Sequence, residues 1–114
     1  CRSRGLGDVY KRQTKTWAME LGPHKVRVNA LCPASVDGER IEAVMARDGE
    51  ERGVSVGDIR QSYERQSSLQ SFTRIEDIAS MVCYLASDAG VRISGQAIGL
   101  DGHTETLGNS LGEI

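Results

Sequence analysis

The cysteines and histidines are the residues of this chain whose chemistry could include metal binding or nucleophilic attack. The three cysteines, Cys1, Cys32 and Cys83, are widely spaced, and no two of them form a Cys-x-x-Cys pair. His24 and His103 each stand far along the chain from any cysteine or histidine at ligand spacing. Zinc sites need such ligands in close groups, so we expect no metal site. An odd number of scattered cysteines favours free thiols, and we expect a cytoplasmic location.

Gly5 and Gly7 could begin a glycine-rich loop that binds phosphate groups. Such a loop follows a strand and carries a third glycine where this chain has Tyr10. No strand-like run precedes Gly5, so the pair does not predict a phosphate site. The surrounding segment, residues 1–13, is basic, has no helical or strand period and resembles a translated sequencing-adapter tail. Because the chain also starts with Cys rather than Met, we expect residues 1–13 to be a non-native or disordered tail.

Regular elements become visible from residue 14 onward. Residues 14–21 have the pattern of the last turns of a helix, with Gly22 as a left-handed C-cap and Pro23 preventing continuation. Residues 26–32 then form a β-branched run with apolar side chains in alternation. This run predicts a mostly buried strand of a parallel sheet.

Residues 34–72 are more polar and predict an excursion between core elements. Apolar side chains at helical spacing predict a short helix near 39–47 and a second one over 55–66. Two amphipathic helices in this place could form a lid over a pocket or an ordinary surface excursion. Since long insertions in compact domains are often functional, we favour the lid.

The clearest helix covers residues 75–86. Thr73 and Glu76 have the spacing of a capping box, and the apolar residues behind them recur on one face that must pack against another element. Residues 95–102 have the pattern of a short strand flanked by glycines, and residues 108–114 are expected to form a loose tail. The order helix, strand, two-helix excursion, helix, strand predicts an α/β fold.

The charge and hydropathy of the chain exclude several classes of partner. The formal net charge is −2, and no block of Lys or Arg supports nucleic-acid binding. No apolar run approaches the roughly 20 residues that a membrane helix requires. We therefore expect neither nucleic acid nor a membrane as a partner. A weakly acidic chain with a pI near 5.7 suits an enzyme with a small-molecule substrate, and it suits many other proteins as well.

Three blocks of the sequence stand in order along the chain: TKTWAMELGPHKVRVNALCP, EDIASMVCYLASDAG and ISGQAIGLDG. Together they resemble one protein family, the classical short-chain dehydrogenases/reductases. The family segment from the end of the catalytic-tyrosine helix into the sixth strand is similar to TKTWAMELGPHKVRVNALCP. The penultimate helix resembles EDIASMVCYLASDAG, and the final strand resembles ISGQAIGLDG. The resemblance implies that residues 14–107 are the C-terminal part of an incomplete, Rossmann-like, doubly wound parallel sheet. It also implies that the full-length protein, the parent of this chain, is an NAD(P)-dependent oxidoreductase that acts on a carbonyl or alcohol, for example a 3-oxoacyl reductase. The resemblance further implies that this parent is a homo-oligomer.

The same resemblance places four residues beside the nicotinamide of NAD or NADP. The family ends its sixth strand with Pro-Gly-x-Val, and the matching residues are Pro33, Ala34, Ser35 and Val36. Ala34 adds a methyl group where backbone and cofactor approach closely, and alanine disfavours positive φ. A threonine often follows the valine by two residues, whereas Gly38 stands there and offers no side-chain contact. Pro33 could also be a simple strand terminator.

The last strand of the family usually ends in Asp-Gly-Gly, and this chain has Asp101-Gly102-His103. His103 could face a substrate pocket or a neighbouring subunit, and we favour a solvated turn.

The acid–base pair of the family, a tyrosine followed four residues later by a lysine, is missing from the sequence. Four residues of helix bring two such side chains to one face, but Tyr10, Tyr63 and Tyr84 are not followed by lysine at that spacing. By the family's spacing the pair would fall at Ser3 and Gly7, and neither residue fits. We therefore assign no catalytic residue and expect the chain to be inactive alone, although the resemblance implies that its parent is an enzyme.

Two other functions are weighed against this one. A genuine short protein could be a non-catalytic oligomerisation or interaction module, with helix 75–86 and the last strand as its interface. Nucleic-acid binding by residues 39–86 is disfavoured because acidic residues surround the start of this stretch. A two-strand remnant would leave open edges and an uncovered apolar face, so we also expect marginal stability or poor solubility.

Overall fold

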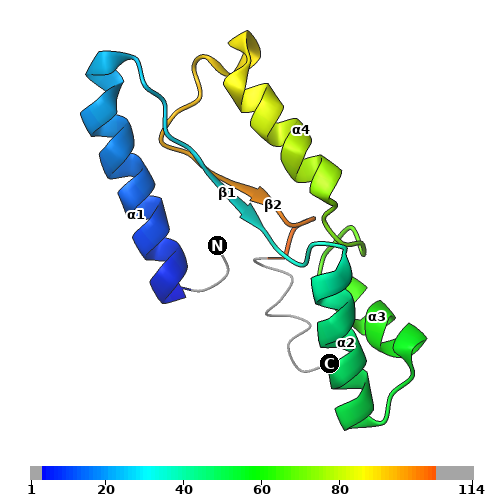
Figure 1. Ribbon diagram of the computed structural model, residues 1–114. Helices are drawn as coiled ribbons and strands as arrows, with labels where there is room; N and C mark the ends of the chain where they lie inside the picture. The colour runs from blue at the N-terminus through cyan, green and yellow to red at the C-terminus, as the bar shows by residue number, and fades with distance from the viewer. Residues whose placement is uncertain (1–3, 105–114) are drawn as a thin grey trace.

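The computed structural model describes residues 4–104, in which α-helices surround and follow a small parallel sheet (Figure 1). The described elements are, in chain order, α1 (Arg4–Leu21), a 3-10 turn (Gly22–His24), β1 (Ala30–Pro33), α2 (Glu39–Arg52), α3 (Val56–Glu64), α4 (Ile75–Ala86), a second 3-10 turn (Asp88–Gly90) and β2 (Ala97–Leu100). The predicted loose tail, residues 108–114, lies outside the described residues.

Helix α1 confirms the predicted helix end but begins much earlier than expected. It is 18 residues long and starts at Arg4, so the expectation of an irregular segment is wrong from Arg4 onward. Long unbranched side chains such as Lys11 and Arg12 have high helix propensity, and no proline interrupts the run. The predicted left-handed cap at Gly22 is also wrong. Lys25 adopts the left-handed conformation instead, and its N–H donates to the Gly22 carbonyl at 2.9 Å.

Strands β1 and β2 form a parallel pair, with Ala30 opposite Ala97 and Pro33 opposite Leu100. The first strand starts four residues later than its β-branched pattern predicts. The preceding segment is held by side chains instead: the Asn29 amide donates to the Ile93 carbonyl at 2.9 Å and accepts from the Gln96 N–H at 3.1 Å. The side-chain amide of Asn29 therefore takes the place of backbone ladder bonds at the beginning of the sheet.

Helices α2 and α3 confirm the two predicted helices of the excursion. Helix α2 runs past the expected end because Gly49 continues the helix and Gly53 provides its left-handed C-cap. Ser55 caps α3, its hydroxyl accepting from the Asp58 N–H at 3.2 Å. Both helices are short, so the side chains packed between them must supply most of the stability of this pair.

Helix α4 confirms the predicted helix, but its cap and its surroundings differ from the prediction. The Asp77 carboxylate, rather than Glu76, accepts the Arg74 N–H at 2.9 Å. The apolar face of α4 is largely open. Leu85 is buried, whereas Ile75 is 64% exposed and Val82 is 50% exposed.

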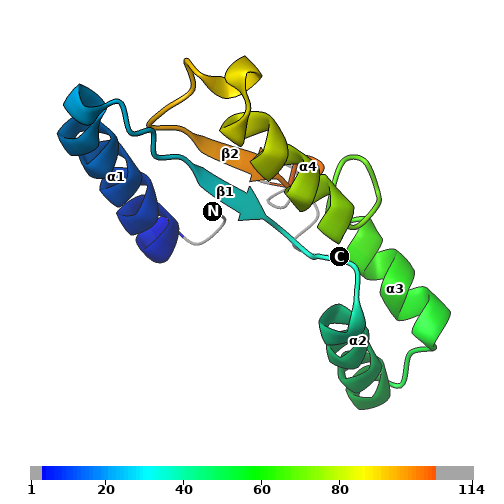
Figure 2. The same ribbon diagram turned by 45° about the horizontal axis from the view of Figure 1, so that its top comes forward.

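The two strands lie between α1 and α4, and the α2–α3 pair extends beyond the ends of the strands (Figures 1 and 2). The buried hydrophobic side chains form a small set within the described residues: Cys32, Met45, Ile59 and Leu85. Cys32 is disulfide-bonded, so the expectation of free thiols is wrong there, whereas Cys83 is free and exposed. Sequence spacing does not report which sulfur atoms meet in space. Across residues 4–104, no helix combines the length and apolar character needed to span a bilayer.

Candidate functional site

The candidate site lies where the two parallel strands end. Pro33 is the last residue of β1, and residues 34–38 lead from it to the start of α2. In open α/β sheets, ligands bind outside the carboxyl ends of the strands, where loops and helix N-termini converge. The four residues predicted to lie beside a nicotinamide therefore occupy the position that the architecture favours for a ligand.

Thr73 fixes the backbone of this segment. Its N–H donates to the Ser35 carbonyl at 3.0 Å, and its carbonyl accepts from the Asp37 N–H at 2.8 Å. These two bonds form an isolated parallel bridge between Val36 and Thr73. The Thr73 hydroxyl then donates to the Leu100 carbonyl at the end of β2. One residue thus joins the predicted cofactor segment to the second strand.

Sequence reasoning missed this role of Thr73, because it assigned the residue to the cap of the following helix. Threonine is favoured in strands as well as at caps. The signal that could have separated the two roles is Asp77, which stands at the N3 position of a helix capped at Arg74.

An open cleft of about 560 Å³ lies beside the segment, between it and the N-terminal ends of α2 and α4. Three of the four predicted residues, Ala34, Ser35 and Val36, line the cleft, and Pro33 does not. The other lining residues mix polar backbone with apolar side chains: Asp37, Gly38, Glu39, Arg40, Ile41, Val44 and Ile75. Such a cleft can receive a flat, partly apolar ring. Acidic side chains at the start of α2 work against an anion there.

The chain departs from the family pattern at Ala34 and at Gly38, and the backbone conformation has different consequences at the two positions. Ala34 is not among the residues with positive φ, so the methyl group adds bulk without backbone strain. Gly38 has φ 153° and ψ −174°, a region that is essentially restricted to glycine. A threonine at position 38 could not adopt this backbone without strain. The backbone at the start of α2 therefore favours glycine at position 38, and the side-chain contact that a threonine would provide there is lost.

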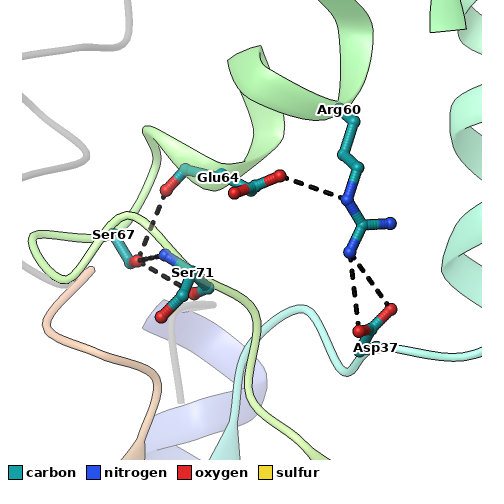
Figure 3. A network of polar contacts seen from close by, with 5 residues as sticks. All are labelled: Asp37, Arg60, Glu64, Ser67 and Ser71. Atoms are coloured by element: carbon teal, nitrogen blue, oxygen red, sulfur yellow. Dashed lines mark hydrogen bonds and ion pairs between the residues drawn. The ribbon is translucent and has the colours of Figure 1, made fainter. Parts of the chain in front are cut away.

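A polar network connects the segment to α3 (Figure 3). The Arg60 guanidinium donates through Nε to the Glu64 carboxylate at 3.1 Å and through its terminal nitrogen to the Asp37 carboxylate at 3.4 and 3.5 Å. The Ser67 hydroxyl donates to the Ser71 carbonyl at 3.1 Å and accepts from the Ser71 N–H at 3.3 Å. The network thus spans the loop after β1, helix α3 and the loop that returns towards α4.

A second open cleft of about 560 Å³ lies on the loops around residues 68–73 and 99–103. Its edge is a turn in which the Asp101 carboxylate accepts from the His103 N–H at 2.8 Å and from the Thr104 hydroxyl at 3.0 Å. His103 has φ 70° and is exposed, which confirms the predicted turn. It also lines this cleft, so the alternative position facing a pocket stays open.

Tyr63, which lines a small pocket together with Ala34 and Ser35, is not tuned for proton transfer at neutral pH. A tyrosine that moves a proton at neutral pH needs a lowered pKa. Burial, together with the hydrogen bond that Tyr63 donates to Asp48, instead raises the pKa of Tyr63 above its ordinary value. Within residues 4–104, no group of three or more His, Cys, Asp or Glu side chains could hold a metal ion. Of the expected positions of the Tyr–Lys pair, Ser3 lies outside the described residues.

Comparison with known proteins places this geometry in a family. Residues 10–103 match the family described as enoyl-(acyl carrier protein) reductase. The 3-oxoacyl-(acyl-carrier-protein) reductase of Thermotoga maritima is 32% identical over 89 residues, covering 78% of this chain and 32% of the relative. Carbonyl reductase (NADPH) 2 of Sus scrofa is 32% identical over 88 residues, covering 77% of this chain and 32% of the relative. The chain thus spans about a third of the length of these relatives.

Solved structures agree with the sequence matches. A short-chain dehydrogenase family protein from Francisella tularensis superposes with a TM-score of 0.78 at 26% identity, over 83% of this chain and 39% of that one. L-sorbose reductase from Gluconobacter frateurii, solved with NADPH and L-sorbose, superposes with a TM-score of 0.76 at 20% identity, over 85% of this chain and 37% of that one. These neighbours confirm the α/β fold that the order of elements predicts and the incomplete Rossmann-like sheet that the resemblance implies. The chain belongs to the short-chain dehydrogenase/reductase family.

Proposed function

We propose that this chain is the C-terminal part of an NAD(P)-dependent oxidoreductase that transfers hydride between a nicotinamide cofactor and a carbonyl or alcohol substrate. In this proposal residues 14–107 form one part of the domain, and Pro33, Ala34, Ser35 and Val36 form a wall beside the nicotinamide. The observation that carries the proposal is the cleft at the carboxyl ends of the strands, which three of these four residues line. The cofactor would supply the hydride, and this chain would supply shape and orientation.

The chain by itself is proposed to be inactive. None of its tyrosines is followed by a lysine four residues later, and the chain spans about a third of the length of its relatives. The parent is proposed to be a cytoplasmic homo-oligomer that acts on a small molecule. Reduction of a 3-oxoacyl group and oxidation of a secondary alcohol both remain candidates for its reaction.

A chimera tests this function. Residues 14–104 of this chain would replace the matching C-terminal third of the Thermotoga maritima 3-oxoacyl reductase. Oxidation of NADPH by a 3-oxoacyl thioester would be followed by absorbance, and binding of NADH and NADPH by nicotinamide fluorescence. We expect the chimera to bind a dinucleotide and turn over, and the isolated chain not to turn over. A Val36→Asp chimera, which places a charge in the cleft, should lose affinity. Turnover by the isolated chain, or a folded chimera that binds neither dinucleotide, would contradict the proposal.

A non-catalytic interaction module is the second candidate, because the apolar face of α4 is open to solvent. Ile75 and Val82, which are seven residues apart and share this face, are 64% and 50% exposed. The coding DNA before the Thr14 codon separates the two functions. An in-frame Tyr-x-x-x-Lys there favours the enzyme, and a start signal followed by the codons of residues 1–13 favours the module.

A further inference from the structure

The side chain of Arg60 contacts one residue of its own helix and two residues that lie outside it. On its own helix, α3, it pairs with Glu64 at 3.1 Å. Across the fold it reaches Asp37, which directly follows the four predicted cofactor residues, at 3.4 Å. Its guanidinium carbon also lies 4.8 Å from the centre of the Phe72 ring, in the loop that precedes Thr73. Figure 3 shows the guanidinium between Asp37 and Glu64.

Asp37 is held at both its backbone and its side chain. Its N–H donates to the Thr73 carbonyl at 2.8 Å, and its carboxylate accepts from Arg60. Thr73 also bonds the Ser35 carbonyl, so Asp37 and the predicted cofactor segment share one backbone partner. The position of α3 is thereby coupled to the wall of the cleft through one cation.

We propose that Arg60 is a positioning residue that locks helix α3 onto the loop after β1, so that the α2–α3 pair and the cofactor segment move as one unit. The assignment of that segment to a cofactor rests on the proposed function, whereas the lock itself does not. Arginine suits this role better than lysine, because its planar fork can bond two carboxylates while its face lies on an aromatic ring.

The strength of the lock is limited by exposure to solvent. The side chains of Arg60 and Asp37 are 38% and 42% exposed, so water and salt screen their attraction. A partly exposed ion pair together with a cation–π contact corresponds to about a three- to tenfold change in a local opening equilibrium. This range is large enough to measure and small enough to leave the fold intact.

Amide hydrogen exchange in the full 114-residue chain tests the lock. We expect Arg60→Ala to speed exchange of the Thr73 and Asp37 amides about three- to tenfold, and Arg60→Lys to restore part of the protection. The Ala30 amide, which bonds Gln96 in the sheet, should not change. Arg65→Ala is the matched control, because Arg65 follows α3 directly and is exposed. High salt should reduce the difference in exchange rate between the unmutated chain and Arg60→Ala.

Asp37→Asn provides an independent variant in case Arg60→Ala does not fold. It should speed exchange at Thr73 by a smaller factor than Arg60→Ala, because the contact of Arg60 with Phe72 remains. Adding it to Arg60→Ala should have little further effect, because the partner of Asp37 is already gone. The inference is overturned if Arg60→Ala matches Arg65→Ala at Thr73, or if it accelerates Ala30 equally, which indicates general unfolding.

Dinucleotide binding separates this inference from the proposed function. NADH and NADPH fluorescence titrations on the same variants should show weaker binding for Arg60→Ala than for Arg65→Ala. If neither the unmutated chain nor the chimera binds NADH or NADPH, the proposed function fails. The exchange data alone then still decide whether Arg60 holds α3 on the loop after β1.

Discussion

The hydroxyl of Thr73 donates a hydrogen bond to the backbone carbonyl of Leu100, and this bond connects the end of β2 to the loop that enters α4. The two residues are 27 positions apart in sequence. Since the Thr73 backbone also bonds Ser35 and Asp37, the ends of both strands are tied together at one residue. Thr73 and Leu100 both line the second open cleft, on the loops around residues 68–73 and 99–103.

Thr73→Val should therefore lower the free energy of unfolding by about 1–2 kcal/mol, because the shape is kept while the partly buried Leu100 carbonyl loses its donor. Urea denaturation followed by circular dichroism would measure the change. Thr73→Ser keeps the hydroxyl and should cost clearly less. Equal losses for the two variants would show that the hydrogen bond is not what stabilises the junction.

Two glycines in helices should respond to alanine with opposite signs. A Cβ at Gly49 would lie 3.0 Å from the Val54 carbonyl oxygen and 3.4 Å from the Ile59 side chain, which is 1% exposed. Gly49→Ala should therefore destabilise the α2–α3 pair, by about 1–3 kcal/mol. A Cβ at Gly57 meets nothing within 4 Å, so Gly57→Ala should stabilise the chain by about 0.5–1 kcal/mol. Unfolding midpoints measured side by side would test the difference, and the same sign for both would contradict it.

The packing of α2 against α3 should weaken at alkaline pH through Tyr63. Burial and the neighbouring Asp48 raise the pKa of Tyr63 in the folded chain above that in the unfolded chain, which is about 10. A raised folded-state pKa contributes stability that is present below the unfolded value and is lost as pH rises through the folded value. Stability should thus fall above about pH 10. Tyr63→Phe removes this titration, so its unfolding midpoint should depend less on pH in that range.

The open face of α4 should make the chain associate with itself or precipitate. Exposed apolar side chains on one helix form a contiguous surface that water disfavours. Val82→Lys should lower the apparent mass at a given concentration in analytical ultracentrifugation. Leu69→Lys removes a side chain that is 73% exposed but lies outside α4, and it should have less effect. If the unmutated chain stays monomeric and unfolds cooperatively, both this prediction and the expected poor solubility are contradicted.

Local patterns predicted the elements better than their ends. Apolar spacing predicted α2, α3 and α4, because helix formation depends on neighbours three and four residues away. The start of β1 was misplaced because Asn29 and Ser94 replace ladder bonds with side-chain bonds, which no alternation pattern reveals. Helix α1 was predicted too short because its first half carries propensity without an apolar period.

The sequence by itself determined the α/β order of elements, the family and the residues at the end of β1 where a cofactor is proposed to bind. These features depend on residue types and short spacings, which are written along the chain. Only the tertiary structure decided that Thr73 joins both strand ends, that Arg60 reaches Asp37, and that the face of α4 stays open. These relations join residues more than twenty positions apart or depend on the packing of whole elements. They exist only once the sheet has paired and the α2–α3 pair has packed.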